Sequence, residues 1–209
     1  KGATPPRLAR PEPEPKGEVR LTVEGPGETT FIQVAYRFPN AAHPDYFPLQ
    51  VLDSLLGGAS GLSYKTSRLY RALVDKEFAV DVSSWPEATI DPFLYRIIIT
   101  NHPKRKTEKT LAALDAEIQK LQDKRVSKDE ITRAVKQARA VFAYGSENIT
   151  NQAFWMGYAE MFSSYHWFTS HLSNLAKVTP QDVQRVAQKY FQPANRVIGI
   201  YTPNSRRSK

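Results

Sequence analysis

The side chains that could bind a metal in this 209-residue sequence are its carboxylates and four histidines, because the chain contains no cysteine. His166 and His171 are five residues apart, which places them about 140° apart around a helix, so they cannot hold one metal ion from one face. The other two histidines are His43 and His102, and neither H-E-x-x-H nor H-x-x-E-H occurs in the sequence. We therefore expect no catalytic residue and no metal ligand in this chain.

A glycine-rich segment, Gly57 to Gly61, could in principle hold a phosphate or present a nucleophile. A phosphate-binding loop requires G-x-x-x-x-G-K-[ST] after a strand, whereas these glycines follow an apolar helical pattern. Ser60 lies one residue away from the G-x-S-x-G pattern of hydrolases and does not follow an apolar strand. The segment therefore favours neither phosphate binding nor serine catalysis.

The elements that must position this loop follow from hydrophobic periodicity. Alternating apolar residues predict strands at 18–25, 29–39, 77–88, 92–102 and 196–203. A helix ends at Gly57 or Gly58, one of which supplies a left-handed cap, and a short helix restarts near Thr66. Helices follow from Thr107 onward, and Ser127 begins one of them with a capping box. Because the strands come in adjacent pairs, we predict an α+β fold, with a largely antiparallel sheet and helices packed on one face.

Composition divides the chain into three parts. Residues 1–17 contain five prolines and are expected to be an extended linker that continues from a longer protein. Residues 18–203 are predicted to form a single α+β domain, and residues 204–209 a basic tail. Neither a run of 18 apolar residues nor a signal-peptide pattern is present, so we expect no membrane span in this sequence.

The formal net charge of +8 raises the question of nucleic acid binding. The densest basic segment, Lys104 to Arg139, has 11 Lys or Arg against 6 Asp or Glu, interleaved with an apolar helical period. That pattern is typical of a solvated helix face, and no RNA-binding aromatic motif or Cys/His finger accompanies it. We therefore expect no nucleic acid partner, and a basic module for acidic partners is a minor alternative.

Several motifs in their order resemble the carboxyl-terminal repeat domain of the insulinase/pitrilysin family of zinc metallopeptidases, which includes the mitochondrial processing peptidase. The motifs are HPDYFPLQVLDSLLGGASGLSYKTSRLYRALVDKEFAVDVSS, RVSKDEITRAVKQARAVF and LAKVTPQDVQRVAQKYFQPANRVIGIYTP. Each motif alone is loose, but together they cover nearly all of residues 18–203. The resemblance implies the metallohydrolase fold of that family.

In the family, homologous α+β domains enclose a chamber, and one of them carries H-x-x-E-H and the catalytic zinc. The resemblance thus implies a zinc-bearing homologous domain as partner, in the same chain or in another subunit, and a peptide as substrate. It also implies a substrate-contact loop, comprising Gly57, Gly58, Ser60, Gly61, Ser67 and Arg68. The alternative, that the glycines merely end one helix and let the next begin, weighs about equally.

The sequence departs from the family where active members carry an Arg and a Tyr that stabilise the oxyanion. Val74 and Val80 occupy those positions, and neither can donate a hydrogen bond. The sequence therefore predicts a non-catalytic, substrate-enclosing domain of a zinc metalloendopeptidase, without a cofactor of its own. The alternative is a catalytically dead structural homologue like the core proteins of respiratory complexes. The resemblance slightly favours a periplasmic over a cytoplasmic location.

Overall fold

The computed structural model describes residues 2, 13, 15–58 and 65–204. Within them one sheet has the strand order β1-β5-β2-β4-β3. Every neighbouring pair is antiparallel except β1 and β5, which run parallel. The strands are β1 (Val19–Gly25), β2 (Phe31–Phe38), β3 (Ala79–Pro86), β4 (Phe93–Asn101) and β5 (Arg196–Pro203).

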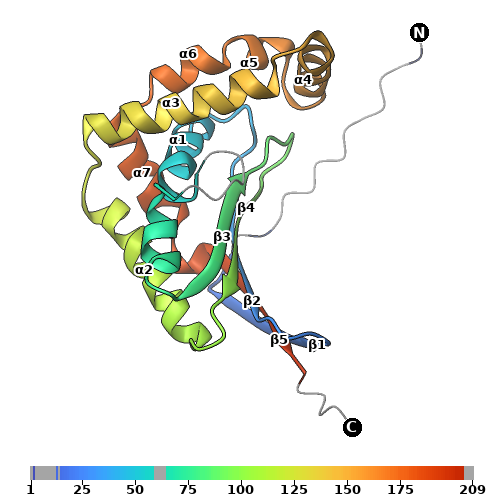
Figure 1. Cartoon of the computed structure of the whole chain (residues 1–209). Helices are drawn as coiled ribbons and strands as arrows, with labels where there is room; N and C mark the ends of the chain where they lie inside the picture. Colours follow the sequence, from blue (N-terminus) through green and yellow to red (C-terminus); the bar gives the residue numbers. More distant parts are fainter. Residues whose placement is uncertain (1, 3–12, 14, 59–64, 205–209) are drawn as a thin grey trace.

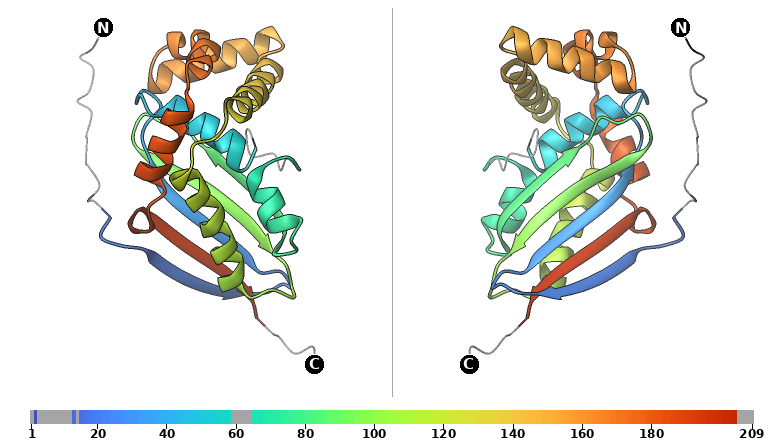
Figure 2. Two further views of the ribbon diagram at one scale, coloured as in Figure 1. Left: turned by 90° about the vertical axis from the view of Figure 1, so that its left-hand side faces the viewer. Right: turned by 90° about the vertical axis from the view of Figure 1, so that its right-hand side faces the viewer.

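The helices pack on one face of this sheet, and among the described residues no helix lies in front of the opposite face (Figures 1 and 2). The sheet and its helical layer confirm the predicted α+β architecture. A single π-helical turn, η2 (Tyr70–Val74), precedes β3, and a 3-10 turn, η3 (Pro193–Asn195), precedes β5. The α-helices are α1 (Tyr46–Leu56), α2 (Thr107–Asp123), α3 (Lys128–Gly145), α4 (Ile149–Phe162), α5 (Tyr165–Thr169), α6 (His171–Ala176) and α7 (Pro180–Tyr190).

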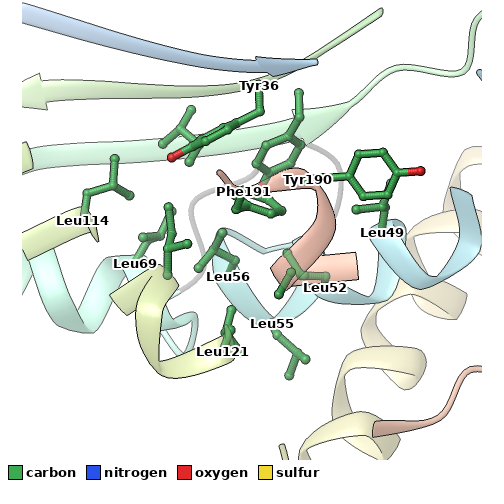
Figure 3. Packing of buried hydrophobic residues seen from close by; sticks show 14 of the residues in the cluster. Tyr36, Leu49, Leu52, Leu55, Leu56, Leu69, Leu114, Leu121, Tyr190 and Phe191 are labelled. Carbon is green, nitrogen blue, oxygen red and sulfur yellow. The ribbon is translucent and has the colours of Figure 1, made fainter. Parts of the chain in front are cut away.

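The core lies between the sheet and the helices that pack on it, chiefly α1, α2 and α7. Alternate residues of β2 point to it, so Ile32, Val34 and Tyr36 are buried while Phe31 is exposed. Figure 3 shows side chains of α1, α2 and α7 meeting under the sheet. Burial of these apolar side chains away from water is the main contribution to the stability of the fold.

Asp45 fixes the start of α1 against the end of α7. Its carboxylate accepts hydrogen bonds from Lys189 Nζ (2.8 Å), from the Tyr190 hydroxyl (2.7 Å) and from Arg185. Burial alone would raise the pKa of Asp45, but these donors outweigh it and hold the pKa well below its usual range. The His-Pro-Asp sequence that precedes α1 is therefore a structural anchor.

The element boundaries agree with the predicted pattern to within a few residues. The capping box of Ser127 and Glu130 is present, and Thr179 forms a second one at the start of α7. No helix in the described ranges is long and apolar enough to cross a membrane. The predicted linker (1–17) and tail (204–209) fall mostly outside the described residues, so those boundaries stay predictions.

Candidate functional site

The glycine doublet ends α1 with two backbone hydrogen bonds. The N–H groups of Gly57 and Gly58 both donate to the carbonyl oxygen of Asp53, at 2.9 and 3.0 Å. Gly58 has φ of +98°, a conformation that side chains rarely adopt, whereas Gly57 has φ of −111°. The left-handed residue of the expected cap is thus Gly58.

Gly57 is needed for a different reason, which is the close approach of α1 to β3. A Cβ atom placed on Gly57 would lie 1.8 Å from Ser84 Oγ and 2.8 Å from Ser84 Cβ. Both distances are shorter than any van der Waals contact. The two glycines therefore serve two separate structural requirements, one steric and one conformational.

A buried hydrogen-bonded group lies beneath this contact. The Asp53 carboxyl accepts hydrogen bonds from Ser84 Oγ at 2.6 Å and from the Tyr95 hydroxyl at 2.8 Å. Burial raises the pKa of Asp53 to about 7, although both hydrogen bonds act to lower it. The sequence did not predict this group, because Asp53 is a single polar position in an apolar helix. Its partners, Ser84 on β3 and Tyr95 on β4, are far from it in the sequence.

Ser67 and Arg68, which follow the glycine-rich segment in the sequence, both have structural contacts. Ser67 Oγ accepts a hydrogen bond from the Tyr70 N–H at 3.3 Å and so caps the helical turn before β3. The Arg68 guanidinium pairs with Glu117 of α2 at 3.2 Å and with Glu130 of α3 at 2.6 Å. Arg68 therefore links α2 to α3.

Glu130 is shared between this ion pair and the capping box of α3. Burial opposes ionisation of Glu130, but hydrogen bonds from Ser127 and Arg68 outweigh it and lower the pKa of the carboxyl. Of the predicted loop residues, Gly57, Gly58, Ser67 and Arg68 can be placed, and each has a structural contact. Ser60 and Gly61 lie outside the described residues.

The two valines at the oxyanion-stabilising positions lie apart. Val74 is partly buried against the core at the end of η2, and Val80 is exposed on β3. Neither side chain offers a hydrogen-bond donor, and stabilising a developing oxyanion depends on such donors.

The residues that the structure describes do not fit a catalytic zinc ion. Within them, no three His, Asp or Glu side chains converge as metal ligands. His171 is buried and stacks on Phe142 with ring centroids 4.6 Å apart, while His43 accepts a hydrogen bond from the N–H of Asp45. A catalytic zinc needs three convergent protein ligands, which these positions do not supply.

The helix-free face of the sheet is apolar near the β1 edge. Val19, Leu21 and Val23 of β1 pair in register with Val197, Gly199 and Tyr201 of β5, and the three β1 side chains are each about half exposed (53, 47 and 51%). Phe31 of β2, which pairs with Tyr201, extends the same surface. We call Val19, Leu21, Val23, Phe31 and Val197 the open-face patch. Apolar surface of this kind on a sheet next to an unpaired edge suits an extended peptide or another domain.

Several solved structures share this architecture. The chain is similar to a protease from Helicobacter pylori (22% identity, TM-score 0.83), covering 91% of this chain and 46% of that one. It is also similar to the inactive peptidase domain of a protein described as a zinc protease from Bordetella parapertussis (24% identity, TM-score 0.78), covering 90% of this chain and 97% of that one. A weaker likeness is to a chain of complex III from Candida albicans (14% identity, TM-score 0.72), covering 90% of this chain and 46% of that one.

The chain thus spans about half the length of the Helicobacter pylori protease chain. No curated protein matches it. In sequence, residues 1–138 match the family described as the peptidase M16 inactive domain. This match covers well over half of the 209 residues and agrees with the resemblance seen in the sequence motifs. The chain belongs to the family of M16 peptidase inactive domains.

Proposed function

We propose that this domain encloses and binds peptide substrate for a zinc metalloendopeptidase without taking part in bond cleavage. The observation that carries the proposal is the open-face patch beside the unpaired edge of β1, on a domain of the inactive M16 type. An extended peptide can add to a free strand edge through main-chain hydrogen bonds, while apolar neighbours hold alternate side chains.

The zinc would be held by a homologous domain carrying H-x-x-E-H, in the same chain or in a partner subunit. Helix α4 and its neighbours offer a surface for such a domain, since large apolar side chains there face solvent. The most exposed are Tyr144 (75%), Ile149 (83%), Phe154 (61%) and Met161 (72%). Apolar area of this kind on a helix is typical of a protein–protein contact.

The test is peptide cleavage by the H-x-x-E-H domain with and without this chain. We expect the catalytic domain to cleave with a higher kcat/KM when this chain is added. This chain without the catalytic domain should cleave nothing. The Leu21→Gln variant of this chain should not raise kcat/KM. The matched control is Thr22→Gln, which changes the next residue of β1 and points to the other face of the sheet.

Cleavage by this chain alone at a chelator-sensitive rate would show that the domain is catalytic. Equal cleavage by a folded catalytic domain in the absence of this chain would remove the enclosing role. That second result would favour a structural homologue, a possibility supported by the likeness to a complex III chain and by the packing roles of Gly57 and Arg68.

A further inference from the structure

A cavity of about 510 Å³ lies among α1, α3, α4, α5, α6 and the segment after β3. Helices α3 to α6 gather beyond one end of the sheet, on the side away from the label of β1 (Figure 1). The volume is in the range of sites that hold small molecules. Its wall is mainly aromatic, with Tyr46, Phe142, Trp155, Tyr158, Trp167 and Phe168.

The polar edges of the tryptophans are already engaged by backbone carbonyl groups. Trp167 Nε1 donates to the carbonyl oxygen of Ala41 at 2.9 Å, and Trp155 Nε1 donates to that of Gly145, a lining residue, at 3.0 Å. These bonds fix the ring orientations. The wall is therefore formed in advance, which lowers the entropy cost of binding.

Two buried polar atoms of residues that line the cavity have no hydrogen-bond partner in the described part of the chain. His171 Nδ1 and Gln50 Oε1 make no hydrogen bond to any residue that the structure describes. His171 is only 6% exposed, and burial lowers its pKa to about 4, so the imidazole is neutral near pH 7. A buried polar atom without a partner destabilises the chain, and a ligand that hydrogen-bonds to the atom removes that cost.

The charged residues on the wall have one sign. Asp53 and Glu87 contribute carboxyl groups, and no Lys or Arg lies among the described residues that line the cavity. The Asp53 carboxyl already accepts two hydrogen bonds and Glu87 is ion-paired with Arg96, so neither is a free charge, but the lining offers an anion no cationic partner. A neutral group that donates a hydrogen bond fits this lining.

We propose that this cavity binds a flat apolar group that carries a hydrogen-bond donor, such as a phenol or an indole. The ring packs between the aromatic walls, and the side chain of His171 or Gln50 turns toward it so that Nδ1 or Oε1 accepts the hydrogen bond. A free small molecule and the Tyr or Trp side chain of a peptide both offer this chemistry. The proposal does not depend on peptide binding at the open-face patch, which lies on a different part of the molecule.

Ligand-observed NMR titration of the 209-residue chain tests the proposal with phenol, toluene and benzoate as probes. We expect phenol to bind about 3- to 10-fold more tightly than toluene, as one hydrogen bond predicts, and benzoate to bind most weakly. N-acetyl-tyrosinamide separates the two sources: binding comparable to phenol indicates a peptide side chain, and much weaker binding indicates a free small molecule.

His171→Phe retains a ring beside Phe142 and removes the acceptor, so the preference for phenol over toluene should fall close to onefold. His166→Phe, the same change at an exposed histidine, should leave the preference intact. Gln50→Leu removes the other acceptor and serves if His171→Phe does not fold. Absence of phenol binding would show that the cavity takes no such ring. Equal binding of phenol and toluene to the native chain, or an unchanged preference in both His171→Phe and Gln50→Leu, would overturn the proposed hydrogen bond.

Discussion

The hydroxyl of Tyr190, near the end of α7, donates a hydrogen bond of 2.7 Å to the carboxylate of Asp45, which directly precedes α1. The two residues are 145 positions apart in sequence. Lys189 and Arg185 of the same helix pair with the same carboxylate. One buried carboxylate therefore holds two of the helices that cover the sheet in a fixed relation.

Asp45→Asn should lower the free energy of unfolding by about 1–3 kcal/mol at pH 7, because the amide keeps the shape but loses the charge. The folded-state pKa of Asp45 is below its unfolded value, so its contribution exists above about pH 4 and disappears as the pH falls further. Urea unfolding at pH 7 and pH 3 measures both effects. Asp75→Asn, at an exposed turn, is the control, and equal stability of Asp45→Asn and native chain at pH 7 would refute the anchor.

Asp53 and His171 should give opposite pH dependences of stability. The raised pKa of Asp53 (about 7) makes the fold less stable as the pH rises from about 4 to 7, while the lowered pKa of His171 (about 4) makes it more stable from about 4 to 6.5. In the native chain these slopes, each up to about 1.4 kcal/mol per pH unit, oppose each other. Denaturant unfolding from pH 4 to 8 should show stability rising with pH in Asp53→Asn and falling in His171→Phe. The same slope in both variants would contradict the assignment.

Alanine substitutions at three glycines should change the free energy of unfolding differently: two should lower it and one should raise it. Gly57→Ala should cost about 1–3 kcal/mol because its Cβ meets Ser84, and Gly58→Ala about 1 kcal/mol because of its positive φ. Gly157→Ala in α4 meets nothing within 4 Å and should stabilise the chain by roughly 0.5–1 kcal/mol. Thermal unfolding compares the three. A Gly57→Ala variant as stable as the native chain would show that the end of α1 can shift freely.

Arg68→Ala should destabilise the chain by about 1–3 kcal/mol, because among the described residues it leaves the buried carboxylate of Glu117 with Lys120 alone as a charged partner. The matched control is Arg71→Ala, three residues along at an exposed position, which should change stability by less than about 0.5 kcal/mol. Urea unfolding at low and high salt separates the ion pair from packing. If Arg68→Ala and Arg71→Ala changed the free energy of unfolding equally, the ion pairs of Arg68 would not stabilise the fold, and its side chain would be available to contact substrate.

Periodicity predicted the layers of the fold but not the neighbours within the sheet. The alternation at Val19, Leu21 and Val23 indicates a strand with two kinds of face, yet it carries no information on which strand lies beside it. The structure places β5 between β1 and β2, although the two amino-terminal strands are adjacent in sequence. That arrangement depends on packing between segments almost 180 residues apart, which no local pattern encodes.

The candidate site was predictable only in its local part. A glycine doublet after an apolar stripe indicates a helix end, and Gly58 confirms it. The requirement for glycine at position 57 comes from Ser84, and the structural contact of Arg68 comes from α2 and α3, so neither could be read from neighbouring residues. The aromatic cavity was equally hidden, because its wall combines residues from α1, α3, α4, α5 and α6.

The position of β5 between β1 and β2 has a consequence for synthesis on the ribosome. β1 is made first but has no hydrogen-bonding neighbour in the sheet until β5, the last strand, has emerged. Until then Val19, Leu21 and Val23 belong to an unpaired apolar segment of the kind that favours aggregation. The domain should therefore complete its sheet only after nearly all of it has been translated, with slow closure of this long-range pair as the final step.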